Sequence, residues 1–274
     1  MNKKWMHLTH HSHLNINSLH AKFTNHAYPR HSHDYYVLSL IARGNQSFLH
    51  KGARYKTYEG GVIFINPDVV HTGETIDEHG FELISIYPTT ANIEAILLDL
   101  TGRSQPAPYF KEAQVNSIGA AQNILFLYKT LSAGVEALKT ETCFLQAFGQ
   151  LLKRYTDSPF REQKIGNEKT AIQKARQYIE EHFYLQVSLK DLANHAGFSP
   201  YYFLRAFRKE VGMPPHEYLE NIRIRHAQKL IEAGATLAHA AVEIGFSSQS
   251  HMTRSFKKII GITPGQYAAQ FRRK

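Results

Sequence analysis

The chain has 274 residues, 43% of them hydrophobic, which is enough for two modest domains that each bury an apolar core. Its one cysteine, Cys143, excludes an intrachain disulfide and suits a reducing compartment, so we expect a cytoplasmic protein. No apolar run approaches the roughly 20 residues that a membrane helix requires, so the sequence predicts no membrane partner.

The positive charge of the chain is unevenly distributed. Residues 1–163 carry 15 Lys and Arg against 14 Asp and Glu, whereas residues 164–274 carry 17 against 9, a net charge of +8. Such an asymmetry predicts a polyanionic partner for the C-terminal part alone. Nucleic acid is favoured over a membrane surface because no basic amphipathic anchor accompanies the charge. The alternative is a basic domain without such a partner.

The first part of the chain has the pattern of β-strands. Between residues 34 and 87, short runs rich in β-branched and aromatic residues, such as YYVLSLIARG and VIFINP, are interrupted by glycine. This pattern predicts a compact antiparallel β-unit at about 28–88. Residues 1–27 are rich in His and Asn without sustained periodicity, so we expect them to form an arm with at most a short strand.

The pattern becomes helical after the β-unit, with a short segment NIEAILLDLTG and then helices at about 115–132 and 135–155. Leu138, Leu145 and Leu152 lie seven residues apart and form one apolar stripe, which Phe148 and Tyr155 extend on the neighbouring ridge. This stripe packs against the β-unit of its own chain or forms the seam of a homodimer, and one helix pair can do both.

A polar linker separates two predicted domains. Residues 156–169 contain Pro159 and Gly166 and have the composition of an interdomain segment, which divides the chain into domains 1–160 and 161–274. Short helices, divided by glycines, are expected after the linker at about 170–182, 188–195, 200–211, 215–233, 237–244, 248–259 and 264–271.

The C-terminal domain contains a repeat. RAFRKEVGMPPHEY (205–218) and RSFKKIIGITPGQY (254–267) share the pattern R-x-F-[RK]-K-x-x-G-x-x-P-x-x-Y. Each copy follows a short helix and a Gly-Phe-Ser turn, at 197–199 and 245–247. Glycine allows the tight turn, and the serine after it can cap the second helix. The repeat predicts two helix-turn-helix units, at about 188–212 and 237–261.

The second helix of each unit has two distinct faces. Phe203 and Phe207 lie four residues apart, as do Met252 and Phe256, so these side chains face one core. The opposite face is predicted to be exposed and to enter DNA, where Arg can read guanine, Gln can read adenine, and Ser, Thr and Lys suit phosphates. The predicted DNA-binding residues are Pro200, Tyr201, Leu204, Arg205 and Arg208 in the first unit, and Ser248, Gln249, Ser250, Thr253, Arg254 and Lys257 in the second.

The segments LANHAGFSPYYFLRAFRKEVGMPP and AAVEIGFSSQSHMTRSFKKIIGITPGQY resemble the DNA-binding domain of AraC/XylS-type transcription regulators. The resemblance covers about residues 170–272. It implies sequence-specific binding of double-stranded promoter DNA, RNA polymerase as a further partner of an activator, and no enzymatic activity. Leu204 departs from the family pattern, because base-reading polar side chains are frequent at its position. First-unit readout is therefore expected to depend on Tyr201 and Arg205.

The segment HSHDYYVLSLIARGNQSFLHKGARYKTYEGGVIFINPDVVHTGE (31–74) resembles the cupin-like effector domain of the same family, a small β-barrel. The resemblance implies a pocket for a small-molecule effector that controls DNA binding. The fold class is then α+β, with an N-terminal cupin-like β-barrel and helical pair and a C-terminal all-α double helix-turn-helix. The predicted effector-binding residues are His31, His33, Tyr35, Tyr36, Asn66, His71 and Glu74.

Metal binding is an alternative that the resemblance raises. In metal-binding cupins two His, a Glu and a later His hold one ion. His31, His33 and His71 are present, but the stretch YYVLSL that follows contains no glutamate. We therefore expect no metal or other cofactor; a Zn²⁺ or other divalent ion would use these three histidines. The alternative function is a metal-dependent cupin enzyme, or a metal sensor, with a DNA-binding appendage.

Overall fold

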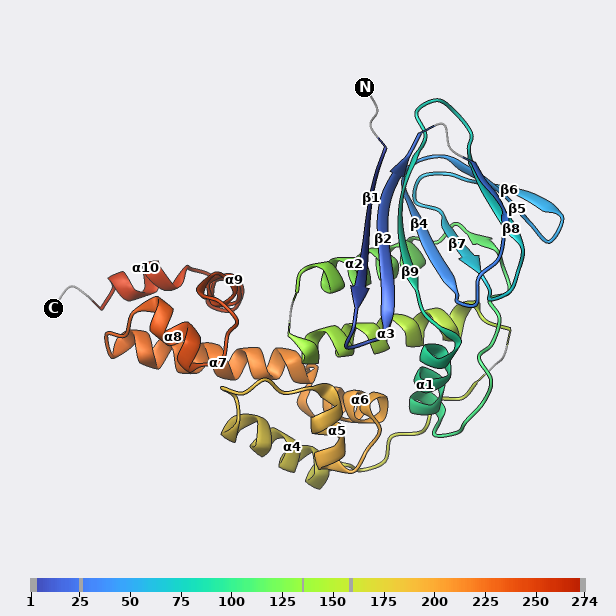
Figure 1. Ribbon diagram of the computed structural model, residues 1–274. Helices are drawn as coiled ribbons and strands as arrows, with labels where there is room; N and C mark the ends of the chain where they lie inside the picture. Colours follow the sequence, from blue (N-terminus) through green and yellow to red (C-terminus); the bar gives the residue numbers. More distant parts are fainter. Residues whose placement is uncertain (1–3, 25–26, 135, 158–159, 272–274) are drawn as a thin grey trace. The chain divides into compact units, whose positions relative to one another are not determined.

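The computed structural model describes residues 4–24, 27–134, 136–157 and 160–271, so Pro159 of the predicted linker lies outside the described residues. The chain divides into two compact units. Unit 1 comprises Met1–Val135 and Cys143–Gln163, and unit 2 comprises Glu136–Thr142 and Lys164–Lys274. In the ribbon, unit 1 holds the strands, whereas unit 2 is helical (Figure 1). Within the described ranges, no helix is both long and apolar enough to cross a membrane.

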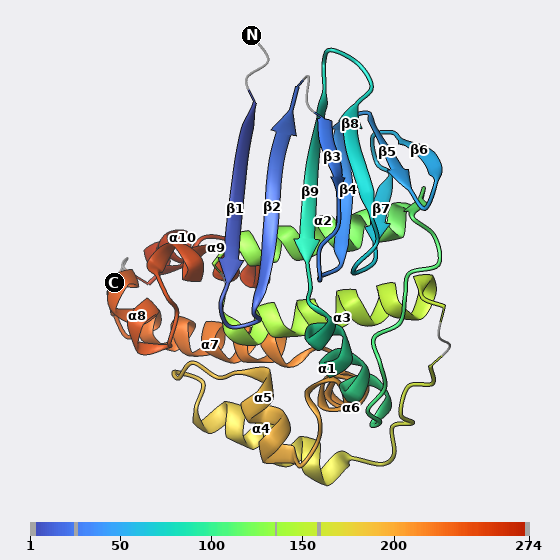
Figure 2. The same cartoon turned by 45° about the vertical axis from the view of Figure 1, so that its right-hand side comes forward.

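Unit 1 contains two antiparallel sheets (Figure 2). The larger sheet has the strand order β1 (Trp5–His11), β2 (Ile16–Phe23), β9 (Phe81–Tyr87), β4 (Val37–Gly44), β7 (Val62–Ile65) and β10 (Gln114–Val115). The smaller sheet has the order β3 (Ala27–His31), β8 (His71–Thr75), β5 (Gln46–His50) and β6 (Ala53–Thr57). The predicted β-rich, cupin-like architecture is confirmed, but its described strands form two open sheets and not one closed barrel.

The prediction of an N-terminal arm is wrong. Strand β1 pairs with β2 in an unbroken register from Trp5 opposite Lys22 to His11 opposite Ile16. Most side chains of β1 are exposed, because β1 is the edge strand of its sheet. The main-chain hydrogen bonds that hold an edge strand do not require apolar side chains, so the polar sequence carried no periodic signal.

Alternate residues of the strands build the core of unit 1. Leu19, Ala21 and Phe23 of β2 point inward at every second position and pack in one cluster with Phe48 and Phe81. Two of the helices expected after the β-unit are α1 (Thr90–Thr101) and α2 (Ile118–Ser132), and α2 packs against strands β9 and β4.

The third helix expected there, α3 (Ala137–Tyr155), carries the predicted apolar stripe. Leu138, Leu145, Phe148 and Leu152 are all buried within the chain. This result favours packing inside the chain over a dimer seam for these side chains.

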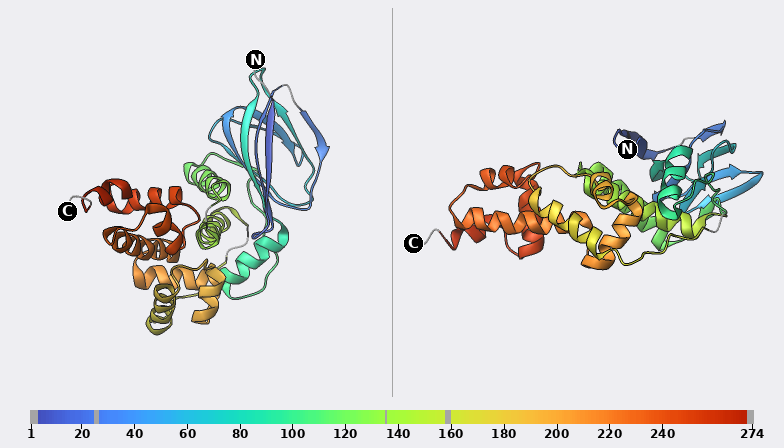
Figure 3. Two further views of the ribbon diagram at one scale, coloured as in Figure 1. Left: turned by 60° about the vertical axis from the view of Figure 1, so that its left-hand side comes forward. Right: turned by 90° about the horizontal axis from the view of Figure 1, so that it is seen from below.

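Unit 2 contains the predicted series of short helices, each within two residues of its expected bounds. They are α4 (Lys169–Glu181), α5 (Leu189–Ala196), α6 (Pro200–Val211), α7 (Pro215–Glu232), α8 (Leu237–Glu243), α9 (Gln249–Ile260) and α10 (Pro264–Ala269). Helices α8, α9 and α10 gather around the C-terminal part of α7, and α4, α5 and α6 contact one another (Figure 3). The long helix α7 therefore joins two small helical clusters.

Candidate functional site

Local sequence signals position the helices of the first helix-turn-helix unit, α5 and α6. Ser188 and Asp191 form the capping box that begins α5. Gly197 ends that helix in the left-handed conformation, with a φ of 74°. The side chain of Ser199 then accepts a hydrogen bond from the backbone N–H of Tyr202 at 3.4 Å and caps α6. The predicted Gly-Phe-Ser turn is confirmed in this unit.

The turn of the second unit, between α8 and α9, differs by one residue. Gly245 has a φ of 79°, and a Cβ there would lie 2.4 Å from the backbone oxygen of Tyr184, so only glycine fits. The cap of α9 is Ser248, which accepts a hydrogen bond from the backbone N–H of His251 at 3.1 Å. The prediction that Ser247 caps this helix is wrong, because α9 begins one residue later than the first-unit pattern implies.

The shared Phe and Tyr of the repeat make the same contact twice. The rings of Phe207 and Tyr218 lie edge to face with centroids 5.6 Å apart, and those of Phe256 and Tyr267 do so at 5.4 Å. Both phenylalanines are fully buried. The Tyr267 hydroxyl also donates a hydrogen bond to Glu232 at the end of α7. The repeated pattern therefore fixes the helix after each unit to the unit before it.

The predicted reading face of α9 is exposed, whereas Met252 on its other face is buried. Thr253 is partly buried. The exposed side chains of this face are Ser248, Gln249, Ser250, Arg254 and Lys257. A helix that presents guanidinium, amide, hydroxyl and ammonium groups on one face can donate hydrogen bonds to base edges and to phosphates.

The predicted reading face of α6 is only partly exposed. Arg208 is exposed and Arg205 is half-buried, but Tyr201 is only 8% exposed and Leu204 only 1%. The prediction that these last two side chains lie on an exposed face is therefore wrong. The physical reason is that all four residues from Tyr201 to Leu204 are buried. Four consecutive residues span about one full turn of a helix, so burial here is not confined to one face. The Arg205 guanidinium lies 5.8 Å from the Tyr201 ring centroid. Pro200, the first residue of α6, is half-buried.

One basic side chain of unit 2 is not available to a partner. Arg223 of α7 is 1% exposed and donates hydrogen bonds to the backbone oxygens of Phe183 at 2.6 Å and Leu185 at 2.8 Å. It also forms an ion pair with Glu136, which belongs to the same unit. The sequence-based charge count included Arg223 in the positive charge offered to a partner. Its hydrogen bonds and ion pair instead show that it stabilises the interior of the unit.

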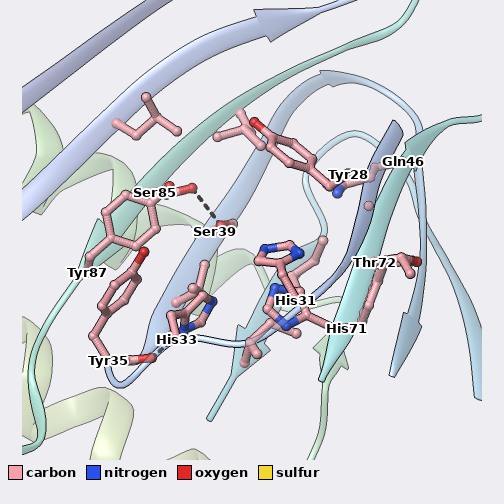
Figure 4. A pocket seen from close by; sticks show the side chains of 17 residues that line it. Tyr28, His31, His33, Tyr35, Ser39, Gln46, His71, Thr72, Ser85 and Tyr87 are labelled. Atoms are coloured by element: carbon pink, nitrogen blue, oxygen red, sulfur yellow. Dashed lines mark hydrogen bonds between the residues drawn. The ribbon is translucent and has the colours of Figure 1, made fainter. Parts of the chain in front are cut away.

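Unit 1 contains a cavity of about 190 Å³, and both of its sheets contribute to the lining (Figure 4). Apolar side chains such as Leu19, Val37 and Phe48 form part of the wall. The polar side chains that line it are Tyr28, His31, His33, Tyr35, Ser39, Gln46, His71, Thr72, Ser85 and Tyr87. Four of the predicted effector-binding residues are therefore brought together here, namely His31, His33, Tyr35 and His71.

Three predicted effector-binding residues do not line the cavity. Tyr36 is buried and donates a hydrogen bond to a backbone oxygen at 3.0 Å. The amide of Asn66 exchanges two hydrogen bonds with the backbone of Phe110, at 2.9 and 3.1 Å. Glu74 forms an ion pair with Arg54. Proximity in sequence suggested these positions, but neighbouring residues of an extended segment point in opposite directions.

Sequence reasoning missed several polar residues of the cavity, Ser39, Ser85 and Gln46 among them. Ser39 of β4 and Ser85 of β9 lie opposite each other and share a hydrogen bond of 2.6 Å. The side-chain oxygen of Gln46 is buried, and among the described residues it has no hydrogen-bond partner. Alternate residues of a strand share one face, so the sequence places Ser39 on the same face as Tyr35 and Val37. Ser39 could therefore have been predicted.

Three histidines meet in the cavity. One ring nitrogen from each of His31, His33 and His71 lies within 4.8 Å of the others. In each residue Nδ1 lies 2.8 to 2.9 Å from a backbone oxygen two residues away in the chain. A carbonyl oxygen only accepts hydrogen bonds, so Nδ1 carries the hydrogen in the neutral rings and Nε2 keeps its lone pair.

The electrostatics of the cavity favour uncharged side chains. Burial lowers the pKa of His33, and it lowers the pKa of His71 to about 4, with His31 and His33 as neighbours that add to the effect. Burial also raises the pKa of Tyr28 and of Tyr35. The described lining contains no Asp, Glu, Lys or Arg. At neutral pH the cavity therefore offers the neutral imidazoles of His33 and His71 and the phenol groups of Tyr28 and Tyr35.

A ligand-sized cavity in one unit and two helix-turn-helix units in a basic second unit define a ligand-binding, DNA-binding regulator. The model of the AraC-like ligand binding domain matches residues 13–148, and that of a helix-turn-helix domain matches residues 192–270. The chain belongs to the AraC family of transcriptional regulators. It is an AraC-type DNA-binding regulator with an N-terminal ligand-binding domain, and the alternative of a cupin enzyme or metal sensor is not favoured.

Similar proteins span most of the chain. The uncharacterized HTH-type transcriptional regulator YbfI of Bacillus subtilis (strain 168) is 32% identical over 240 residues, covering 88% of this chain and 86% of its own. The HTH-type transcriptional activator RhaS of Pectobacterium carotovorum subsp. carotovorum (strain PC1) is 23% identical over 250 residues, 87% of this chain and 86% of its own. ToxT from Vibrio cholerae O395, whose crystal structure is known, is 14% identical in sequence. The two structures superpose with a TM-score of 0.38, and the match covers 94% of this chain and 99% of that chain.

Proposed function

We propose that this protein binds double-stranded promoter DNA through α6 and α9, and that a small-molecule effector in the cavity of unit 1 controls this binding. The observation that carries the proposal is the duplicated helix-turn-helix in residues 164–274, which carry a net charge of +8. The connecting helix α7 has 18 residues and is about 27 Å long at 1.5 Å per residue. This length is close to the roughly 34 Å between successive major-groove faces, so one chain can reach two of them.

Helix α9 is the main sequence-reading element in this proposal. Its exposed face combines Arg254, which can pair with guanine, and Gln249, which can pair with adenine. Helix α6 contributes Arg205 and Arg208, which suit phosphate oxygens or a guanine edge. With Tyr201 and Leu204 buried, the share of α6 in base reading is expected to be smaller than that of α9.

The test of this proposal begins with a duplex selected from a random DNA pool by the full chain. Fluorescence anisotropy should give a selected duplex at least about 10³-fold tighter binding than a shuffled duplex of the same composition. The affinity for both should fall steeply with salt, because neutralised phosphates release counterions. Equal affinity for the selected and shuffled duplexes would refute sequence-specific binding.

A homodimer is part of the proposal, and it is supported by a different surface from the one that the sequence suggested. The stripe of α3 is buried in the chain, but α2 exposes two large apolar side chains, Ile118 at 79% and Phe126 at 51%. We expect the full chain to sediment as a dimer and the Phe126→Asp variant to shift toward monomer. A wild-type monomer at high micromolar concentration would contradict the dimer.

The remaining elements of the proposal follow from the regulatory role. The protein acts in the cytoplasm, where its promoters lie, and it has no catalytic activity. If it activates transcription, RNA polymerase is a further partner. Transcription from a promoter that contains the selected duplex, with and without the protein, distinguishes activation from repression.

A further inference from the structure

Helix α3 contributes residues to both units of the chain. The match to the AraC-like ligand binding domain ends at residue 148 and so includes the first part of this helix, whereas the match to the helix-turn-helix domain begins at residue 192. The structure nevertheless places Glu136–Thr142 in unit 2 and Cys143–Gln163 in unit 1. The unit that carries the two helix-turn-helix motifs therefore includes a short segment that its family match does not contain.

Glu136, directly before α3, pairs with the buried guanidinium of Arg223 in α7. The side chain of Arg223 is 1% exposed and that of Glu136 is 15% exposed. A buried charge is unfavourable unless it is paired, and removing one partner of a buried ion pair leaves the other charge uncompensated. The N-terminal end of α3 is therefore tied to the helix that connects the two helix-turn-helix units.

Arg223 in turn contacts both helix-turn-helix units. Its guanidinium donates hydrogen bonds to the backbone oxygens of Phe183 and Leu185, in the segment that leads from α4 into α5. The same group lies 5.7 Å from the ring centroid of Phe246, a distance at which a cation is attracted to the face of an aromatic ring. Phe246 belongs to the Gly-Phe-Ser turn of the second unit. The ion pair of Glu136 thus fixes a side chain that links the two units.

Glu141 makes a separate contact with the first helix-turn-helix unit. Its carboxylate accepts a hydrogen bond of 2.7 Å from the backbone N–H of Leu189, the first residue of α5. The N–H groups of a first helical turn have no partner within the helix, and the positive end of the helix dipole favours a carboxylate. The side chain of Ser188 caps a different N–H, that of Asp191. Glu141 therefore supplies an acceptor that the local capping box does not.

We propose that Glu136 and Glu141 are positioning residues for DNA reading, which hold the two helix-turn-helix units in the relative orientation that lets α6 and α9 read one DNA site together. Glu141 acts on the first unit through the start of α5. Glu136 acts on the second unit through Arg223 and Phe246. Both carboxylates belong to one helical segment that continues into the ligand-binding unit, which gives that unit a covalent connection to the reading helices.

The test uses the full chain and a pair of duplexes. One is the duplex selected by the wild-type protein, and the other carries one additional base pair between the parts that α6 and α9 contact, mapped by hydroxyl-radical footprinting. One base pair rotates one part against the other by roughly 35°, since a turn of DNA has about 10 to 10.5 base pairs. Wild type should bind the lengthened duplex at least about 10-fold more weakly, because even one lost base contact costs about 5- to 150-fold.

The two α3 variants should lower this spacing ratio. Glu136→Ala and Glu141→Ala are each expected to bind the selected duplex about 3- to 10-fold more weakly, the cost of one lost interaction. Their ratio of selected to lengthened duplex should fall at least about 3-fold below that of wild type, because units that are no longer held can adapt to the new spacing. A loss of folded protein weakens both duplexes by the same factor and leaves the ratio unchanged. If Glu136→Ala does not fold, Glu141→Ala carries the test.

Glu181→Ala is the matched control for the loss of one negative charge. Glu181 is exposed at the end of α4, and its carboxylate accepts a hydrogen bond of 2.8 Å from Gln177 of the same helix. This variant should keep the wild-type ratio. A fall as large as that of Glu141→Ala would overturn the proposal, because the charge of the unit, and not the contacts of α3, would then determine the ratio.

This inference rests on the proposed function, and the two can fail separately. Equal binding of the selected and shuffled duplexes by wild type overturns the proposed function. Specific binding by wild type overturns the positioning role alone if wild type tolerates the inserted base pair, or if the folded α3 variants keep the wild-type ratio. Tighter binding of the selected duplex by either variant also overturns it, because the contacts of α3 would then oppose DNA reading.

Discussion

Replacing Arg254 by alanine tests whether α9 reads bases. The side chain is exposed on the second turn of α9, so its removal should leave the free energy of unfolding within about 0.5 kcal/mol of wild type. A guanidinium that donates two hydrogen bonds to one guanine discriminates against other bases by about 1 to 3 kcal/mol. The selected duplex should therefore bind about 5- to 150-fold more weakly to Arg254→Ala. The shuffled duplex should lose much less.

Lys257 provides the control for this prediction, because it lies three residues further along the same exposed face of α9. If Lys257 contacts phosphate, Lys257→Ala should weaken both duplexes about equally and reduce the slope of log affinity against log salt by about 1. Fluorescence anisotropy at four salt concentrations measures both quantities. Equal losses on both duplexes for Arg254→Ala would refute base reading and move this residue to a phosphate contact.

Three further predictions concern the stability of unit 2. Ser248→Ala removes the cap of α9 and should cost about 1 kcal/mol, or about 4 °C in Tm, whereas Ser247→Ala should change neither quantity in a calorimetric scan. Phe256→Ala should cost about 3 to 5 kcal/mol in urea unfolding and abolish DNA binding, because the ring is fully buried; a loss below 1 kcal/mol would contradict its role as core. Burial lowers the pKa of His216 to about 4, below its unfolded value, so the unfolded chain binds more protons and the stability from this residue falls as pH decreases from about 6.5 to 4. Between pH 7 and 5 this loss should reach about 2 kcal/mol in wild type and be absent in His216→Gln; equal pH dependence of the two proteins would show that another group titrates.

The helices of unit 2 could be predicted closely because local chemistry ends them. Gly197 and Gly212 adopt left-handed backbone at the ends of α5 and α6, and Pro215 begins α7 at its first position. These signals act within one turn of the chain, so they are visible in the sequence without knowledge of tertiary packing. The second-unit cap was placed at Ser247 by analogy, and a shift of one residue to Ser248 was enough to make that prediction wrong.

Features that depend on contacts between distant segments could not be predicted in the same way. The pairing of β1 with β2 depends on main-chain hydrogen bonds, which a polar edge strand makes without an apolar pattern. Asn66 was assigned to the pocket because it lies in the segment that resembles the family's effector domain, but its amide is used by the backbone of Phe110, 44 residues away. The burial of Leu204 is likewise a property of the folded chain and not of the helix period.

The two copies of the repeat show how one scaffold can carry two different surfaces. Phe207 and Phe256 occupy equivalent buried positions, and each meets the tyrosine eleven residues later in an edge-to-face contact. These contacts use the residues that the copies share, so the shared pattern maintains the fold of each unit. The residues at the predicted reading positions are not shared, since Leu204 is apolar and buried where Thr253 is polar and partly exposed. If the copies read DNA unequally, Thr253→Leu should change sequence preference at the half of the site that α9 contacts, while the Phe–Tyr contacts keep both units folded.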